Sequence, residues 1–191
     1  MSDFPLIAVT DASSCPRPLT EQLLRLKQAP IAPAALLLRA KALSRADYHA
    51  LARQVQKICT TQQLPLILHS DWQLAGELGI NRLHLPLSLL PSLPETEKKR
   101  LRWLSTSVHS VKEAQQAAAL GAQALIAGHI YATQCKAGLP PRGLSFLQAV
   151  CAATSLPVYA IGGIGFSSAQ LAELKATGAR GACVMSAYMQ V

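Results

Sequence analysis

The sequence is poor in aromatic and charged residues, which make up 5% and 15% of its 191 positions. Few rings are available on which nucleobases could stack, and the basic residues are scattered apart from a short cluster within Lys98–Arg102. A nucleic-acid-binding surface is therefore not expected. A hydrophobic fraction of 50% excludes a disordered chain, so aliphatic side chains must fill the core.

Signals for disulfides, zinc, export and a membrane span are also missing. The five cysteines are odd in number and form no CxxC pair, which is typical of reduced thiols. The first residues lack a basic segment before an apolar run. The most apolar stretch, Ile31–Leu43, is broken by Pro33, Arg39 and Lys41, so it is too short and too charged to span a membrane. We expect a cytoplasmic protein.

What the sequence does have is a regular alternation of short apolar runs and amphipathic segments. Near-continuous apolar runs are typical of buried parallel strands. Eight such runs predict one compact (β/α)8 TIM-barrel domain over residues 1–191, with a doubly wound open sheet as the alternative. No GxGxxG follows the first run, which disfavours that alternative. The predicted strands are Pro5–Thr10, Ala35–Arg39, Pro65–His69, Arg82–Leu85, Leu104–Val108, Ala124–Gly128, Val158–Gly162 and Ala182–Ser186.

Helix caps support the same architecture. Ser44 is expected to start a helix that runs to Gln62, Ser110 to start the helix that Gly121 stops, and Ser167 or Ser168 to start the helix that Gly178 ends. Few residues follow the eighth strand, so we expect the usual final helix to be missing. Neighbouring strands and helices would then expose apolar surface, and this predicts a homo-oligomer.

The segments after the seventh and eighth strands are candidates for phosphate binding, because barrel sites lie at the carboxyl ends of strands. Gly162 and Gly163 allow backbone N–H groups to approach an anion, and Ser186 offers a hydroxyl or a backbone donor. A tight turn without a ligand is the simpler interpretation of Gly-Gly. The excess of 18 Lys and Arg over 10 Asp and Glu is compatible with an anionic ligand.

Other candidates also lie at strand ends. Arg39 and Lys41 have the spacing to face the same side after the second strand, although one could equally be a surface cation. His69 closes the third strand and is expected to line the pocket. A hydrogen-bonded structural role is expected for His84 and His109. His49 is expected to face solvent from its helix, and Cys135 is expected to be an ordinary loop cysteine.

Several segments resemble those of the thiamine-phosphate synthase/TenI superfamily of barrels. They are LSTSVHSVKEA, AGHIYATQCKAGLPPRG, LPVYAIGGIG and GACVMSAY, with looser similarity at AVTD and LLLRAKALS. The resemblance runs from about Leu6 to Tyr188 and implies a barrel that binds a phosphorylated thiazole.

Two branches of this superfamily differ in chemistry. The synthases join a pyrimidine diphosphate to a thiazole phosphate with Mg²⁺, and their pattern carries Asn-Asp after the third strand and Gly-Gln-Glu-Asp after the fourth. The matching residues here are His69-Ser70 and Pro86–Leu89. Serine and leucine cannot replace carboxylates as ligands of a hard cation. The resemblance therefore disfavours the synthase, and Mg²⁺ is expected only if that alternative holds.

The segment after the sixth strand is closer to the TenI-type pattern of Gly-His, Thr-x-Cys-Lys-x-Gly and Arg-Gly. This similarity implies a cofactor-free thiazole tautomerase with His129 as acid and base. It also implies that Gly162, Gly163 and Ser186 hold the phosphate. Further pocket residues implied by the resemblance are Arg39, Lys41, Lys136, Ser107 and Thr133. A non-catalytic protein that binds thiazole or thiamine phosphate remains a further alternative.

Overall fold

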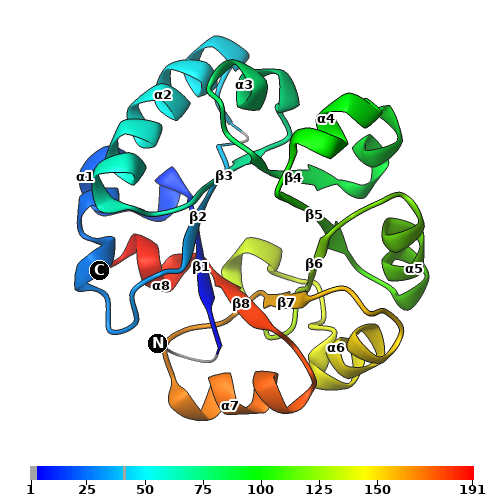
Figure 1. Cartoon of the computed structure of the whole chain (residues 1–191). Coiled ribbons are helices and arrows are strands. Elements are labelled where there is room, and N and C mark those ends of the chain that lie inside the picture. The colour runs from blue at the N-terminus through cyan, green and yellow to red at the C-terminus, as the bar shows by residue number, and fades with distance from the viewer. Residues whose placement is uncertain (1–3, 41) are drawn as a thin grey trace.

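The chain forms a closed barrel of eight parallel strands in the order β1 to β8, with β8 pairing back onto β1. This computed structural model describes residues 4–40 and 42–191. Figure 1 shows the ring of strands surrounded by helices. The predicted (β/α)8 architecture is confirmed, and ring closure excludes the doubly wound open sheet.

Each predicted strand forms, with ends that differ from the prediction by at most two residues. Buried aliphatic side chains fill β1 and β2 and most of β3 and β6, as expected where both faces of a sheet are covered, whereas β4 and β5 also carry the buried polar residues His84, Ser105 and Thr106. The strands are β1 Leu6–Val9, β2 Ala35–Leu38, β3 Leu66–His69, β4 Arg82–Pro86, β5 Trp103–Val108, β6 Ala124–Gly128, β7 Val158–Ile161 and β8 Gly181–Val184.

The helices begin where the capping residues predict. Ser44, Ser110 and Ser167 each accept a hydrogen bond from the backbone N–H three residues on, which satisfies a donor that the first turn leaves free. The α-helices are α1 Leu19–Leu24, α2 Arg45–Gln62, α3 Trp72–Glu77, α4 Glu95–Arg100, α5 Val111–Ala119, α6 Gly143–Ala152, α7 Ser168–Ala176 and α8 Ser186–Met189. Short 3-10 helices are η1 Ala12–Ser14, η2 Leu26–Gln28, η3 Leu87–Ser92 and η4 Gln134–Lys136.

Alternating strand residues divide the core into two layers. Ile7, Leu37 and Ile126 belong to the cluster inside the barrel, whereas their neighbours Leu36 and Leu38 belong to the layer between strands and helices. The period of two along a strand produces this division. Aliphatic packing inside the ring makes the barrel a filled core, so a ligand can enter only at its ends.

The seam, where β8 closes onto β1, is covered by the one-turn helix α8. The expectation that no final helix forms is wrong in this respect, because Tyr188 and Met189 are fully buried and fold α8 onto the barrel. The Tyr188 ring meets Phe166 edge-on at 4.9 Å, and its hydroxyl donates to the Ile31 carbonyl at 2.9 Å. Buried Gln22 of α1 donates to the carbonyls of Tyr188 and Val191, both at 3.0 Å.

The packing of α8 weakens the reason for expecting a homo-oligomer. Within the described residues, the exposed large hydrophobic side chains are Leu24, Leu43 and Leu139, which lie on separate segments. Self-association stays a prediction, which light scattering would test. No helix in the described part of the chain has the length and apolar character needed to cross a membrane.

Asp71 ties α2 to α3. Its carboxylate caps α3 by accepting from Leu74 N–H at 2.8 Å, and it also contacts His49 Nε2 at 2.9 Å and Arg45 Nε at 3.4 Å. The expectation that His49 faces solvent is wrong: its side chain is 22% exposed and turned toward Asp71. Burial alone would raise the pKa of Asp71, but these hydrogen bonds and nearby positive charges lower it below its ordinary value.

We expect Asp71→Ala to reduce the free energy of unfolding by about 1–2 kcal/mol at pH 7, the range for a lost N-cap. Because the folded-state pKa of Asp71 is depressed, its stabilisation is present above the unfolded pKa of about 3.9 and is lost as pH falls through the folded value. Urea denaturation of the wild type and of Asp71→Ala, measured between pH 7 and pH 3, should therefore show that the difference between their free energies of unfolding becomes smaller as the pH falls.

The matched control is Glu77→Ala, which removes an exposed carboxylate paired with Arg53 at 3.4 Å. Its cost should stay below about 0.5 kcal/mol, as for other exposed pairs. If the free energies of unfolding of wild type and Asp71→Ala differ by the same amount at every pH, the assigned role of the carboxylate is contradicted.

Candidate functional site

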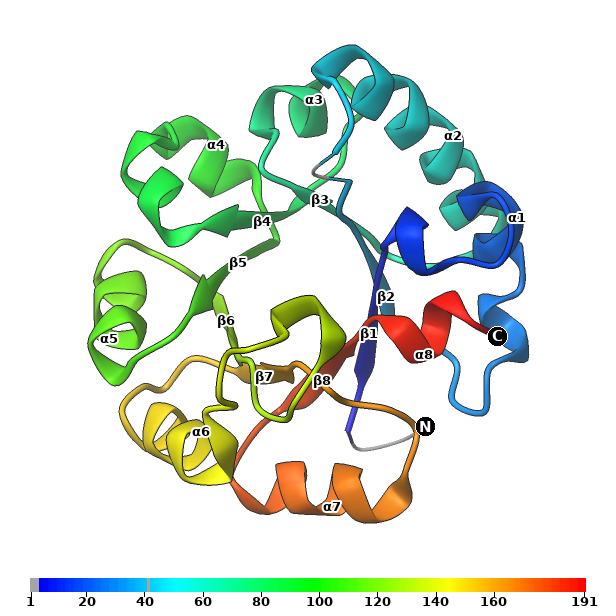
Figure 2. The same cartoon turned by 180° about the vertical axis from the view of Figure 1, so that it is seen from behind.

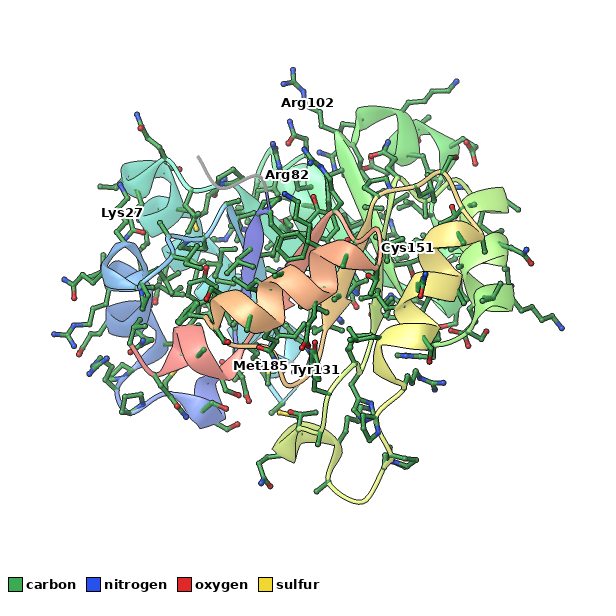
Figure 3. The ribbon with its side chains drawn as sticks, turned by 90° about the horizontal axis from the view of Figure 1, so that it is seen from below. Lys27, Arg82, Arg102, Tyr131, Cys151 and Met185 are labelled. Carbon is green, nitrogen blue, oxygen red and sulfur yellow. The ribbon has the colours of Figure 1, made fainter. Side chains whose placement is uncertain are left out.

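All eight strands run in parallel, so their carboxyl ends open at one mouth of the barrel. Figure 2 shows the loop between β6 and α6 lying across this mouth, in front of β7 and β8. In Figure 3, Tyr131 and Met185 lie at this end, whereas Arg82 and Arg102 lie at the opposite one. The predicted site residues that follow strands, Lys41 excepted because it lies outside the described residues, therefore share one mouth.

Gly162 and Gly163 form the turn after β7 and are packed against the β6–α6 loop. Their φ angles of 104° and 68° lie in the left-handed region that favours glycine. A Cβ on Gly162 would come within 2.3 Å of the His129 Cβ, and one on Gly163 within 2.5 Å of the Ala132 carbonyl oxygen. The tight-turn interpretation therefore accounts for the lack of side chains here.

The same turn also leaves donors for an anion. Among the described residues, no group accepts a hydrogen bond from the N–H of Gly163 or Ile164, whereas Gly165 N–H donates to Gln170 Oε1 at 2.9 Å. Gln170 in turn donates to the Gly163 carbonyl at 2.9 Å, which fixes the turn at the start of α7. Fixed N–H groups near a helix N-terminus favour an anion. Ser186 is exposed after β8, on the neighbouring strand.

His129 follows β6 directly and is half-buried. Its backbone carbonyl accepts from Arg142 N–H at 3.0 Å, and the next residue, Ile130, donates to the Ile161 carbonyl at 2.9 Å. The ring makes one long contact, from Nε2 to the Leu139 carbonyl at 3.4 Å. Its backbone is therefore held firmly and its imidazole weakly.

Two further predicted residues lie on the β6–α6 loop. Thr133 is half-buried and precedes η4, while Lys136 is exposed in η4. No described group forms a hydrogen bond or ion pair with the Lys136 ammonium. This cation is therefore available to a ligand at the mouth.

Arg39 follows β2 and is anchored by buried Thr10, whose hydroxyl donates to the Arg39 carbonyl and accepts from its N–H, both at 2.8 Å. In the part of the chain that the structure describes, its guanidinium has no hydrogen bond and no ion pair. Lys41, predicted to be its neighbour in the pocket, lies outside the described residues.

A cavity of about 530 Å³ lies beyond β3, β4 and β5. Two predicted pocket residues, His69 and Ser107, line this cavity. His84 and His109, for which the sequence indicates only structural roles, line it as well. His84 is 3% exposed and its ring nitrogens contact Ser105 Oγ at 2.9 Å and Ser107 Oγ at 3.0 Å. The rings of His69 and His84 lie 5.4 Å apart. Histidines at the ends of three successive strands were the signal that could have predicted this cluster.

His109 also connects this cavity to the β6–α6 loop. Its Nδ1 lies 2.8 Å from the Gly128 carbonyl oxygen, so this nitrogen carries the proton. Nε2 is then the ring atom left for a ligand. His109 thereby holds the residue that precedes His129.

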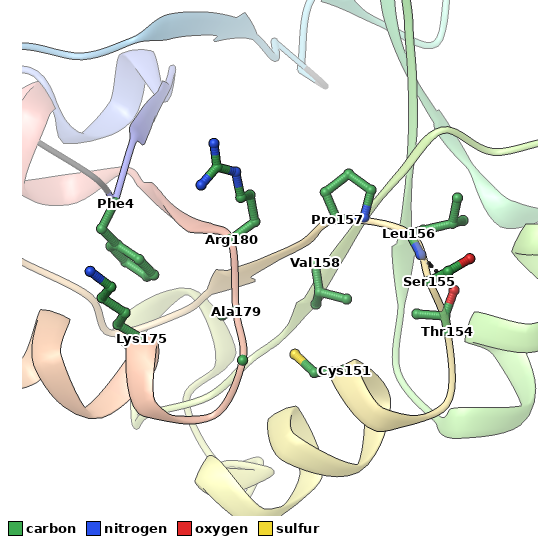
Figure 4. A pocket seen from close by; sticks show the side chains of 11 residues that line it. Phe4, Cys151, Thr154, Ser155, Leu156, Pro157, Val158, Lys175, Ala179 and Arg180 are labelled. Atoms are coloured by element: carbon green, nitrogen blue, oxygen red, sulfur yellow. Dashed lines mark hydrogen bonds between the residues drawn. The ribbon is translucent and has the colours of Figure 1, made fainter. Parts of the chain in front are cut away.

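A second cavity, of about 570 Å³, lies at the opposite end of the barrel (Figure 4). Lys175, Phe4 and Arg180 lie on one side of it, and Thr154 and Ser155 on the other. None of the predicted site residues contributes to its lining. We place the candidate site at the mouth, where barrel enzymes carry out their chemistry.

The carboxylates near the mouth do not suit Mg²⁺. Mg²⁺ prefers oxygen ligands that converge in octahedral geometry. The Asp71 carboxylate is bound to His49 of α2 and to the Leu74 N–H of α3. Asp11 accepts hydrogen bonds from the hydroxyls of Ser13 and Ser14, and Glu113 accepts one from the backbone N–H of His109. Among residues 4–40 and 42–191, no three His, Cys, Asp or Glu side chains converge on a possible metal position.

Residues 6–188 match the family described as "Thiamine monophosphate synthase". The chain belongs to this family. A curated relative from Herpetosiphon aurantiacus named "Thiamine-phosphate synthase" is 37% identical, over 81% of this chain and 74% of the relative. Another of that name, from Syntrophomonas wolfei, is 31% identical over 98% of this chain and 90% of the relative.

One solved structure has the same fold as this chain. It is titled "Thiamine phosphate pyrophosphorylase from Pyrococcus furiosus", with a TM-score of 0.78 and 24% sequence identity, and covers 98% of this chain and 88% of that chain.

These relatives overturn the tautomerase interpretation. It rested on the Gly128–Gly143 loop, in which Gly-His precedes Thr133 and Lys136, and on the lack of the synthase carboxylates at Ser70 and Leu89. The curated relatives, similar over most of the chain, are named as synthases, and an isomerase as the main activity is not supported. In the structure His129 contacts Gly162 through its backbone and Cβ, so the local pattern also has a packing role.

We expect Gly162→Ala to destabilise the mouth, because a methyl group would overlap His129 at an angle of φ that disfavours alanine. The free energy of unfolding should fall by about 1–3 kcal/mol, as for other overpacked sites. Gly165→Ala is the matched control, since nothing lies within 4 Å of its Cβ position. Equal stability of the two variants in urea would contradict the close packing at Gly162.

Proposed function

We propose that this chain is a thiamine-phosphate synthase, a transferase that joins a pyrimidine diphosphate to a thiazole phosphate and releases the diphosphate. The observation that carries the phosphate-binding part of the proposal is the turn after β7, where Gly163 and Ile164 offer two N–H groups beside the start of α7. The names of the curated relatives support the reaction.

Each part of the mouth has a proposed task. The Gly162–Gly163 turn and Ser186 bind the phosphate of the thiazole, and this places its ring beside His129 and Thr133. Arg39 and Lys136 bind the diphosphate. Cationic side chains at a leaving group stabilise the charge that develops as it departs. His69 and Ser107 line the cavity beyond β3 to β5, on the same side as the diphosphate.

The family also implies Mg²⁺, and the residues at the mouth do not fit it. Ser70 and Leu89 stand where the synthase pattern has carboxylates, and the nearby acidic groups are hydrogen bonded elsewhere. This observation favours a second candidate function, in which the chain binds thiazole phosphate or thiamine phosphate without joining the two substrates.

A coupling assay distinguishes the two candidates. We expect purified protein to form thiamine phosphate from both substrates, measured by chromatography. Lys136→Gln should lower the rate by at least about tenfold, because a cation at the leaving group is lost. Lys57→Gln is the control, since Lys57 is an exposed cation near the end of α2.

No product with wild-type protein, together with calorimetric binding of thiazole phosphate, would contradict the synthase and support the second candidate. Equal rates for the two lysine variants would contradict the role of Lys136. Thermal unfolding of both variants checks that each is folded.

A further inference from the structure

The β3 end of the mouth has a hydroxyl where a metal site would need a carboxylate. Ser70 has a φ of 66°, and its N–H donates to the His84 carbonyl at 2.9 Å. Its hydroxyl lies 2.7 Å from His69 Nδ1, so it is already hydrogen bonded. The left-handed backbone is one that Asp also tolerates, so the fold itself does not explain the missing charge.

The β4 end provides no carboxylate either. Leu89 lies in η3 and its side chain packs against the core, while Leu87 and Ser88 face the cavity. A side chain at position 89 that coordinated a metal would have to turn away from the core. Two strand ends that could supply anionic oxygens thus supply neutral or apolar groups.

The acidic residues that remain are held by other partners. Both Asp71 oxygens are used, one by Leu74 N–H and the other by His49 and Arg45. Asp11 Oδ1 accepts from Ser13 Oγ and Asp11 Oδ2 from Ser14 Oγ, both at 2.8 Å. Freeing any of them for a cation would break a cap or a turn.

Positive charge at the mouth is provided by the protein itself. Arg39 is held at its backbone by Thr10, and Lys136 is exposed on the loop across the mouth. Arginine stays charged at all physiological pH values, and its planar fork matches two oxygens of a phosphate. A guanidinium can thus neutralise a diphosphate that Mg²⁺ would neutralise in a protein with the synthase carboxylates.

We propose that the mouth of this barrel binds phosphate and diphosphate groups without a divalent cation, with Arg39 as the principal counter-charge for the diphosphate. The proposal rests on the phosphate-binding function proposed above. It predicts that metal-free diphosphate is the bound form.

Competition for Mn²⁺ tests this directly, with inorganic diphosphate as the probe and free Mn²⁺ measured by electron paramagnetic resonance. A protein that takes metal-free diphosphate withdraws it from Mn²⁺, so the free Mn²⁺ signal should rise when protein is added. A protein that binds a metal–diphosphate complex makes the signal fall. A fall would overturn the proposal.

Calorimetry of inorganic diphosphate in EDTA provides the second measurement. Binding should persist in EDTA, and Arg39→Gln should weaken it by at least about tenfold, the size expected for a charge-assisted contact. Arg53→Gln, an exposed arginine on α2, should change the affinity less than twofold. Thermal unfolding checks that both variants are folded. If Arg39→Gln is folded and its affinity for diphosphate is unchanged, the proposed role of Arg39 is overturned.

The outcomes separate this inference from the proposed function. Binding that needs Mg²⁺ or Mn²⁺ overturns the inference and leaves the synthase proposal standing. Metal-free binding without product in the coupling assay supports the inference and contradicts the synthase. No binding of diphosphate in either buffer overturns the inference and the assignment of Arg39 and Lys136 to the diphosphate.

Discussion

The close approach of two backbone segments, at the ends of β6 and β7, is the constraint on which the mouth depends. Gly128 leaves no room for a side chain, since a Cβ there would meet the Ile161 carbonyl oxygen at 2.4 Å. Gly162 and Gly163 continue this contact along the β6–α6 loop. Because backbone lies against backbone, the turn that offers N–H donors and the loop that carries His129 and Lys136 are positioned as one unit.

The sequence predicts the barrel well because its signals are local. Apolar runs identify the strands. Ser44, Ser110 and Ser167 identify helix starts, because each serine side chain accepts a hydrogen bond from the backbone N–H of the residue three positions later. The pairing of His49 with Asp71 joins residues from two helices and leaves no local pattern. The one-turn α8 likewise depends on tertiary packing of Tyr188, because so short a helix has little stability of its own.

The site is predictable only in part, for a similar reason. Gly162, Gly163 and Ser186 follow from the rule that barrel sites lie at strand ends. The shared cavity of His69, His84 and His109 appears only when three strand ends are placed side by side. The choice of reaction went wrong because the Gly128–Gly143 loop and the missing carboxylates at Ser70 and Leu89 were given more weight than similarity along the whole chain. A loop that holds cations and a histidine suits more than one reaction of a phosphorylated thiazole.

The hydrogen bonds from Gln22 to the carbonyls of Tyr188 and Val191 join α1 to the far end of the chain. Contacts across such sequence separations carry a large loop-closure entropy, so the ring is expected to close late in folding. Ser186 lies on that seam, between β8 and Tyr188. An anion bound there would favour the closed ring by mass action, and ligand concentration would then set how often the barrel opens.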